Sequence, residues 1–406
     1  MAWNRKIVEQ GDEAMRGAAR SPQHDRRMAF TSVGVLIAAL VVAFIVIHDS
    51  STVSASQSAY KAPDPVTPLE VTNVTPASGS TAVPYNTSLT VSFSGPLQAR
   101  TPTPTLSPSV PGTWRRTNPK TLTFTPSISF APYAEESITI PGGPSGVRGE
   151  HGGELGETIT SSFTVEPGST LRLQELLAQL GYMPLTWTPA GSPPSTSLPP
   201  AGSPVPGGTG ADSAAPQQGT FSWRWASTPG SLQALWQPGK LNKITEGAVM
   251  AFAQAHGLQS DGNAGYHIWS ALLAASSTGQ QDASPYTYIH VSKTLPETLT
   301  LWRNGSVVLT SPCNTGIAGA ATPDGTWPIY LRYTAQTMRG VNPNGVSYVA
   351  PDVRWINYFH GSDAVHGYPR ASYGFPQSVG CVELPIPTAD TVWHIVGIGT
   401  LVTVVS

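Results

Sequence analysis

Residues 358–384 read YFHGSDAVHGYPRASYGFPQSVGCVEL, and this stretch holds Cys381, one of two cysteines in a chain of 406 residues, together with His360 and His366. The thiolate is the reactive form of cysteine, and a nearby imidazole both lowers the thiol pKa and carries protons. Gly380 has no side chain, so the backbone before Cys381 can approach a substrate closely. The amides of Gly380 and Cys381 are therefore predicted oxyanion donors for acyl transfer at the cysteine.

Other interpretations of these residues remain open. A cysteine near a histidine is often structural, since free cysteine is among the most buried residue types. His360, His366 and Cys381 are also side chains of the kind that bind zinc. No other part of the chain repeats a metal-ligand spacing, so we predict no metal and no other cofactor. Alkylation of Cys381 near neutral pH would separate a reactive thiol from an inert one.

The sequence on either side of this stretch predicts a domain dominated by β-strands over residues 285–406. Asn304-Gly305 is a strong hairpin signal. A helix is predicted from about residue 388 to residue 395. Alternating apolar and polar side chains predict strands at residues 286–291, 299–302, 306–310 and 399–405.

Residues 285–406 resemble the L,D-transpeptidase (YkuD-type) family. The resemblance implies a β-sandwich with the cysteine in a cleft, in an actinobacterial-type cell-wall enzyme. It is carried by His366-Gly367, by Ser378-Val379-Gly380-Cys381, and by the upstream phrases Tyr288-Ile-His-Val291, Asn304-Gly305, Asn314-Thr-Gly316 and Thr322-Pro-Asp-Gly-Thr326.

The activity that this resemblance implies is crosslinking of peptidoglycan, with carbapenems as acylating inhibitors. Cys381 would attack the amide between the third residue of a stem peptide and the terminal D-Ala, which leaves. The side-chain amine of a second stem would then resolve the acyl-enzyme into a 3→3 crosslink. His366, 15 positions before Cys381, would be general base and acid, and His360, at 21 positions, is the rival base. The carbonyl of Gly367 would orient the His366 ring.

Two residues depart from the family pattern. Val379 stands where a histidine is usual, and Glu383 stands where an arginine is usual. The second change removes an anchor for a substrate carboxylate, and Glu383 could instead pair with Arg370 or Arg354. Both changes concern donor specificity more than reaction class. The predicted substrate-binding residues are Ser378, Tyr348, Met338, Arg370 and Glu383, and Arg339 is expected beside Met338 in the same wall.

The second thiol, Cys313, precedes a loop that lies near the cleft in this family. It is either a small buried residue or, in an oxidising compartment, a disulfide partner of Cys381. Two other functions also remain open for the domain. With water as acceptor it would be an L,D-carboxypeptidase, and with a decayed site it would be a non-catalytic wall-binding protein.

The N-terminal residues predict export. Residues 28–47 form an uncharged apolar run preceded by several basic residues, which predicts a single transmembrane helix with residues 1–27 in the cytoplasm. Residues 48–68 read as a linker that leaves the membrane. The alternative is a cleaved signal peptide, since Val53-Ser54-Ala55 would fit a cleavage site. We therefore expect a single-pass membrane protein whose catalytic domain lies in the cell wall.

Two further domains are predicted between the linker and the catalytic domain. Residues 69–167 read as an all-β spacer that loosely resembles bacterial Ig-like modules. Residues 168–277 resemble a small helical peptidoglycan-binding-like domain, through LQELLAQLGY, AVMAF and DGNAGYHIW. Its role is either wall binding or docking. Its Pro/Gly/Ser/Ala-rich insert, residues 188–219, is predicted to be a disordered surface loop.

Two features of composition bear on partners. Trp223, Trp225 and Trp236 follow the insert and would either stack on sugar rings or pack a small core. Charged residues make up 11% of the chain and the net charge is −2, so a nucleic-acid partner has no electrostatic support. The expected partners are peptidoglycan stem peptides and, through the N-terminal helix, the cytoplasmic membrane.

Overall fold

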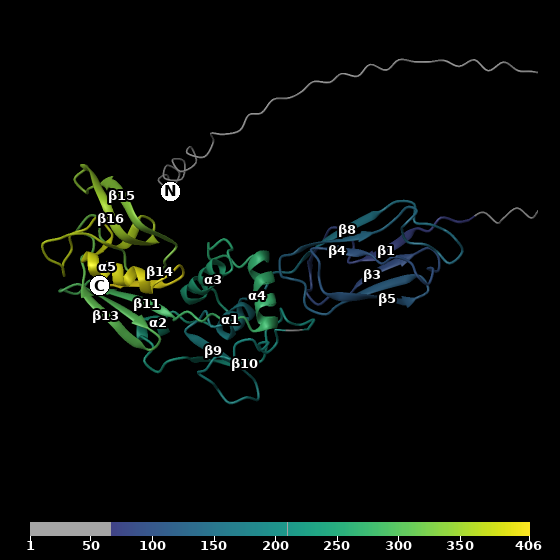
Figure 1. Cartoon of the computed structure of the whole chain (residues 1–406), viewed down its shortest axis with the longest axis horizontal. Coiled ribbons are helices and arrows are strands. Elements are labelled where there is room, and N and C mark those ends of the chain that lie inside the picture. The colour runs from purple at the N-terminus through teal and green to yellow at the C-terminus, as the bar shows by residue number, and fades with distance from the viewer. Residues whose placement is uncertain (1–65, 209) are drawn as a thin grey trace, which may run out of the picture. The chain divides into compact units, whose positions relative to one another are not determined.

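The computed structural model describes residues 66–208 and 210–406 (Figure 1). The predicted cytoplasmic tail, the membrane helix at residues 28–47 and most of the linker lie outside these residues. Within the described ranges, no helix is both long and apolar enough to cross a bilayer.

The first domain is a sandwich of two four-stranded sheets, with strand orders β1-β3-β6-β5 and β2-β8-β7-β4. Alternation places every second side chain inside, as in β3, where Leu89, Val91 and Phe93 are buried. The all-β prediction is confirmed. The strands are β1 (Val71–Thr75), β2 (Ser80–Val83), β3 (Leu89–Phe93), β4 (Thr105–Ser107), β5 (Gly112–Asn118), β6 (Thr121–Pro126), β7 (Glu135–Ile140) and β8 (Ile159–Val165).

Glu136 of β7 points into this sandwich. It is 1% exposed, and its Oε2 atom has no hydrogen-bond partner within the described residues. Burial alone raises the pKa of this carboxyl from 4.5 to about 7. A buried carboxylate without a partner is costly, because the charged form loses its hydration.

We expect this carboxyl to make the domain less stable as pH rises. Between pH 4.5 and about 7 the folded state holds a proton that the unfolded chain has released, so the free energy of unfolding falls across this window and is level above it. The fall is up to about 3 kcal/mol, at about 1.4 kcal/mol per tenfold change in proton affinity. Calorimetric unfolding at pH 5 and pH 8 should show the loss in wild type and in Glu135→Gln, an exposed neighbour, but not in Glu136→Gln. Equal pH dependence in all three proteins would refute this account.

The second domain contains helices and one hairpin. Gly181, at a φ of +91° just beyond Leu180 at the end of α1, is the predicted helix stop. The domain has a buried core from α1, α3 and α4, and the hairpin of β9 and β10 was not predicted. The elements are α1 (Thr170–Gln179), β9 (Leu185–Pro189), β10 (Gly219–Trp223), α2 (Gly230–Gln233), α3 (Lys243–Ala255) and α4 (Tyr266–Thr278).

The insert at residues 188–219 differs from the predicted disordered loop. Its first and last residues continue β9 and β10, and Val205 and Ala214 inside it are fully or almost fully buried. Arg172 of α1 donates to the carbonyls of Ser213 (3.0 Å) and Gly207. The composition of the insert is indeed poor in core-forming residues, but a buried arginine gives its backbone carbonyls partners that composition does not reveal.

The third domain is built from two sheets and one helix, and its β-sandwich prediction is confirmed. The five-stranded sheet has the order β13-β12-β11-β19-β14, and the four-stranded sheet has the order β15-β16-β17-β18. The elements are β11 (Thr287–Ser292), β12 (Thr298–Arg303), β13 (Ser306–Pro312), β14 (Gly325–Pro328), β15 (Leu331–Val341), β16 (Ser347–His360), β17 (Asp363–Gly367), β18 (Val382–Leu384), α5 (Ile386–Ile395) and β19 (Leu401–Val405).

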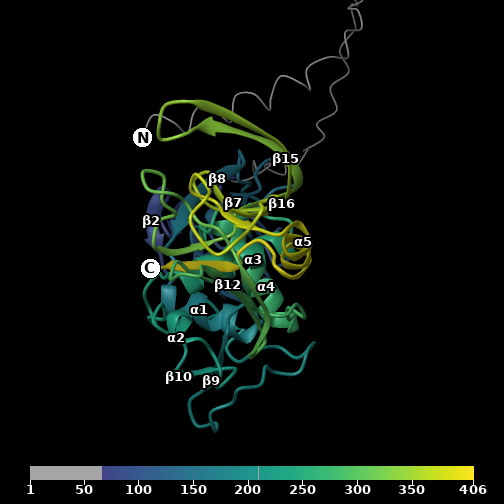
Figure 2. The ribbon, with the colours of Figure 1, turned by 90° about the vertical axis from the view of Figure 1, so that its left-hand side faces the viewer.

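The predicted hairpin at Asn304-Gly305 joins β12 to β13, with both residues at positive φ (43° and 89°). That conformation matches the right-handed twist of the flanking strands. A second hairpin, formed by β15 and β16, is much longer. Before Arg354, β16 pairs with β15 alone, so the tip of this hairpin extends beyond the rest of the sheet (Figure 2).

The helical domain is packed against the third domain. Tyr288, Trp302 and Leu401 share one buried cluster with the helices, and the Trp225 ring lies 5.2 Å from that of Trp302. The tryptophans after the insert therefore pack a core, as one of the two interpretations predicted. A side chain at Gly247 would come within 2.5 Å of the Gly399 carbonyl, so the glycine permits this close approach.

Candidate active site

Two neighbouring strands bring the predicted nucleophile and base together. β17 and β18 run parallel, with Val365 opposite Val382 and His366 opposite Glu383. Val365 and Val382 face the core between the sheets. Because side chains alternate along a strand, His366, Glu383 and the preceding Cys381 project from the opposite face. There His366, Glu383 and Cys381 line a cleft of about 250 Å³.

His366 is 3% exposed, and its Nδ1 lies 3.2 Å from the carbonyl oxygen of Gly367. This carbonyl accepts a hydrogen bond from Nδ1–H, which leaves Nε2 as the basic nitrogen. Burial lowers the pKa of His366 below its usual 6.5, and the Gly367 carbonyl and Glu383 oppose that effect only in part. His366 is therefore neutral near pH 7 and able to accept a proton.

Cys381 is half-buried on the floor of this cleft. Burial raises the pKa of its thiol from 9.0 to about 12, the backbone amide of Ala364 opposes the rise, and the charges of Asp363 and Glu383 add to it. The Sγ atom faces the Ser362 carbonyl at 3.8 Å. Burial of both groups thus favours a neutral thiol beside a neutral imidazole over a thiolate–imidazolium pair.

Ser378 braces the turn that carries Cys381. Its Oγ donates to the carbonyl of Cys381 (2.6 Å) and accepts from the N–H of Gly380 (3.2 Å). Of the two predicted oxyanion donors, the Gly380 amide is thus hydrogen-bonded to Ser378 in this structure, and the Cys381 amide is the donor that we retain in the proposal below. Gly380 has a φ of +116°, and a side chain there would collide with Asp363, so the turn requires glycine.

Arg370 and Glu383 form a bidentate ion pair inside the cleft. Arg370 Nε donates to one carboxylate oxygen (2.8 Å) and Nη2 donates to the other (2.7 Å). The side chain of Glu383 is 6% exposed and that of Arg370 is 30% exposed. Of the two partners considered for Glu383, the structure selects Arg370. Arg354 instead pairs with Asp352.

We expect Glu383→Gln to make Cys381 more nucleophilic. The charge of Glu383 contributes to the raised pKa of the thiol, so removing that charge should lower the pKa. Iodoacetamide alkylation of Cys381, followed between pH 7 and 10 by peptide mapping, should become several-fold faster at a given pH. Asp390→Asn on α5, which neutralises a half-exposed carboxylate outside the cleft, should leave the rate unchanged. An unaltered rate in Glu383→Gln would refute the electrostatic argument.

The other wall of the cleft comes from the long hairpin. Met338 and Tyr348, both predicted, line it. Arg339 does not, because it alternates with Met338 on β15 and lies on the outer face. Four lining residues of this hairpin were not predicted, because nothing in the local sequence marks a strand that folds over a distant cysteine. They are Asn342, Val349, Ala350 and Val353. Tyr368 and Gln377, near the cysteine in sequence, also line the cleft and were not predicted.

The rival base lies elsewhere. His360 Nδ1 is 3.2 Å from Asp363 Oδ2, and its ring stacks on Trp327 with centroids 4.6 Å apart. It does not line the cleft with Cys381.

The second cysteine, Cys313, is fully buried, and burial raises the pKa of its thiol. Both cysteines are free, so the disulfide interpretation is not supported. Within residues 66–208 and 210–406, no cluster of three His, Cys, Asp or Glu side chains would hold a metal ion.

Comparison with known protein families covers the first and third domains. Residues 286–404 match the L,D-transpeptidase catalytic domain family (YkuD), and residues 65–165 match the bacterial Ig-like domain family (Big_5). The C-terminal domain is therefore a YkuD-type L,D-transpeptidase catalytic domain, and the N-terminal sandwich is a bacterial Ig-like domain. The peptidoglycan-binding identity of the helical domain stays a prediction.

The solved structures to which the chain is similar include three proteins described as L,D-transpeptidases or their domains. An L,D-transpeptidase from Mycobacterium smegmatis is 14% identical, with 84% of this chain and 100% of that chain covered and a TM-score of 0.28. L,D-transpeptidase 3 from Mycobacterium tuberculosis is 12% identical, with 83% and 98% covered and a TM-score of 0.28. The catalytic domain of an E. faecium L,D-transpeptidase is 22% identical, with 30% and 100% covered and a TM-score of 0.27. No curated protein matches the sequence.

Proposed function

We propose that this protein is a peptidoglycan L,D-transpeptidase that forms 3→3 crosslinks through an acyl-enzyme on Cys381. The observation that carries the proposal is the placement of Cys381 and His366 in one cleft, with the His366 ring held by the Gly367 carbonyl so that Nε2 is the free base. The family match of residues 286–404 supports the reaction class.

The first half-reaction would begin with a neutral thiol, because burial keeps the pKa of Cys381 high. His366 Nε2 takes the proton as the sulfur attacks the carbonyl carbon of the amide between stem residue three and D-Ala. The oxyanion that forms is stabilised by the Cys381 amide. His366 then gives its proton to the nitrogen of D-Ala, the C–N bond breaks, and a thioester remains on Cys381.

In the second half-reaction, the side-chain amine of another stem attacks the thioester. His366 accepts a proton from this amine, the new amide forms, and the sulfur leaves and is reprotonated. A carboxypeptidase would differ only in using water in place of the amine. The long β15–β16 hairpin restricts one side of the cleft, and we propose that it holds the donor stem through Met338 and Tyr348.

Arg370 would recognise a carboxylate of the donor. Its bonds to Glu383 and to the Gln377 carbonyl use Nε and Nη2, and Nη1 remains for a ligand. Glu383 would therefore act as a positioning residue, since it fixes a guanidinium in the cleft where the family carries an arginine on the strand itself. The bidentate pair is the one that Arg370 forms with Glu383, and it holds the plane of the guanidinium fixed.

We further propose that the chain is held at the cytoplasmic membrane by residues 28–47, with the catalytic domain in the wall. The apolar run and the basic residues before it support this placement.

Incubation of the protein with a disaccharide-tetrapeptide tests the function. Mass spectrometry should detect free D-Ala and a crosslinked dimer whose fragments show a 3→3 bond, and both should be absent for Cys381→Ala. Tripeptide and D-Ala without dimer would establish the carboxypeptidase instead. Unchanged tetrapeptide would contradict both enzymatic functions and favour a wall-binding protein.

A further inference from the structure

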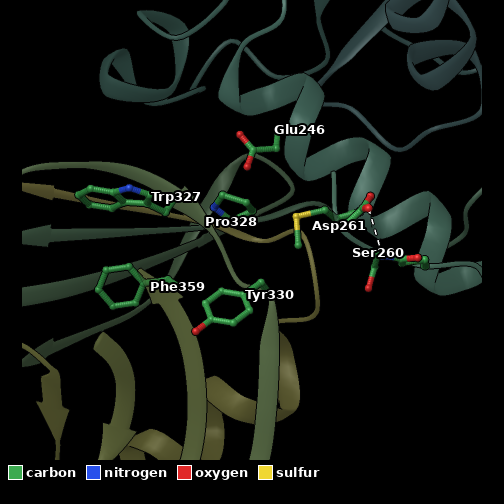
Figure 3. A pocket seen from close by; sticks show the side chains of 9 residues that line it. Glu246, Ser260, Asp261, Trp327, Pro328, Tyr330 and Phe359 are labelled. Carbon is green, nitrogen blue, oxygen red and sulfur yellow. Dashed lines mark hydrogen bonds between the residues drawn. The ribbon is translucent and has the colours of Figure 1, made fainter. Parts of the chain in front are cut away.

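A second cavity of about 490 Å³ lies between the helical domain and the catalytic domain, apart from the Cys381 cleft (Figure 3). Its volume is in the range of small-molecule binding sites, about 300–1,000 Å³. One wall comes from α3 and from the loop that carries the Asp261-Gly262 motif, and the other comes from β14, Tyr330 and β16. Arg370, Glu383 and Cys381 of the catalytic cleft do not line this cavity.

The catalytic-domain wall is aromatic. Trp327, Tyr330 and Phe359 turn their rings toward the same space, with Pro328 between them and the helical domain (Figure 3). Phe359 is buried and forms part of the floor, whereas Tyr330 is 39% exposed. Aromatic rings of this kind offer flat apolar faces, and the tyrosine and tryptophan edges remain polar.

The helical-domain wall is mainly polar, with Met250 as its apolar side chain. Carboxylate, amide and hydroxyl groups come from Glu246, Gln259, Ser260 and Asp261. Glu246, Ser260 and Asp261 lie on the helical-domain side of the cavity (Figure 3). Gly262, at a φ of +80°, lets the Glu246 side chain pack directly on the loop, where a side chain would meet it at 2.9 Å. The DGNAGYHIW motif thus contributes Asp261 to this wall of the cavity.

The charge of this wall is paired only in part. Lys243 Nζ lies 2.7 Å from Glu246 Oε2. Asp261 accepts hydrogen bonds from two neutral donors, the Asn263 amide (2.9 Å) and the Gln259 side chain (3.2 Å). Each carboxylate can still accept further hydrogen bonds. The wall therefore offers acceptors to a ligand rich in hydroxyl and amide groups.

Direct contacts between the helical domain and the catalytic domain fix the positions of the two walls relative to each other. Tyr288 of the catalytic domain donates to Ser231 of the helical domain (2.9 Å), and the close contact of Gly247 with Gly399 lies on the same α3 that carries Glu246. The cavity is consequently formed before any ligand arrives. A preformed site loses less free energy to ordering when it binds.

We propose that this cavity binds a pyranose unit of a glycan strand, with the apolar face of the sugar on Tyr330 and Trp327 and its hydroxyl and acetamido groups on Asp261, Gln259 and Glu246. That the strand belongs to peptidoglycan rests on the proposed function. The location fits such a role, because Tyr330 donates a hydrogen bond to Gly361, and the next residue, Ser362, faces the Cys381 sulfur. A glycan held here would deliver its stem peptides to the turn that borders the nucleophile.

The test measures binding of a β-1,4-linked N-acetylglucosamine tetrasaccharide to the purified full-length chain. Saturation-transfer NMR and calorimetric titration are the two methods of measurement. The probe carries no stem peptide, so its binding does not depend on the chemistry of Cys381. Tyr330→Ala and Gln259→Ala should each weaken binding, Tyr330→Ala by about tenfold because the stacking face is lost. Tyr333→Ala is the matched control, since Tyr333 is similarly exposed, lies on β15 and packs on the same Tyr358 without lining the cavity.

Binding that is lost in Tyr330→Ala and kept in Tyr333→Ala would support the glycan site. Absence of binding to wild type, or equal binding by the two tyrosine variants, would overturn it. A free stem peptide that binds the cavity and shifts Tyr330 resonances, where the tetrasaccharide does not, would overturn it in favour of a peptide site. None of these results bears on whether Cys381 forms an acyl-enzyme, which is measured separately.

Discussion

Replacing His366 with glutamine should lower kcat/KM for the tetrapeptide by about 10²–10⁴-fold, the range that a positioned general base contributes. The effect is expected to be large because the Cys381 thiol, with a pKa of about 12, is not ionised at neutral pH and needs a base during the attack. Glutamine retains an N–H that could reach the Gly367 carbonyl, so the loss would reflect the missing base and not a collapsed cleft.

The pH dependence of kcat/KM is a second test of His366 as the general base. Burial lowers the pKa of His366 below 6.5, so the neutral base should persist into mildly acidic solution and the acid limb of wild-type kcat/KM should lie below pH 6.5. His366→Gln should lose this limb. His360→Gln is the control, because His360 was the rival base and lies outside the cleft. A larger loss in His360→Gln than in His366→Gln would reverse the assignment.

Arg172→Leu should destabilise the helical domain by about 3–5 kcal/mol, the cost of leaving one member of a buried ion pair without its partner. Arg172 and Glu175 are both 0% exposed at an N–O distance of 2.9 Å. The arginine also donates to the carbonyls of Ser213 and Gly207 in the insert. Proteolysis of the insert should therefore become faster in the same variant.

Lys243→Ala is the matched control for this experiment. It breaks another i,i+3 pair, with Glu246, but one whose side chains are 40% and 37% exposed. Exposed pairs of this kind contribute about 0–1 kcal/mol. Chemical unfolding followed by circular dichroism would compare the two variants, and the double variant Arg172→Leu/Glu175→Leu should recover part of the lost stability. Similar small losses in Arg172→Leu and Lys243→Ala would show that the buried pair does not hold the insert.

Most strands, turns and helix ends could be predicted from the sequence, because each is marked by residues that are adjacent in the chain. The alternation at residues 89–93 and 299–303, the Asn304-Gly305 turn and the glycine after α1 each depend on a few adjacent residues. The insert at residues 188–219 was predicted wrongly for the same reason. Its order depends on Arg172, which lies on a helix some distance away in the chain.

In the candidate site, too, features that depend on adjacent residues were predicted, and features that depend on distant contacts were not. The pair of Cys381 and His366, and the role of the Gly367 carbonyl, were predicted from spacing and family resemblance. That Ser378 would occupy the Gly380 amide could not be read from the sequence, because it depends on the geometry of one turn. The hairpin wall and the second cavity depend on contacts between residues far apart in the chain, so they became visible only in the structure.

Intact-protein mass spectrometry after incubation with meropenem, a carbapenem that the family resemblance predicts to acylate the thiol, tests the central claim most directly. Wild type and Cys313→Ala should each gain the mass of one carbapenem adduct, since Cys313 is buried in the core, and Cys381→Ala should gain none. An adduct that persists in Cys381→Ala, or that disappears in Cys313→Ala alone, would contradict the assignment of Cys381 as the nucleophile.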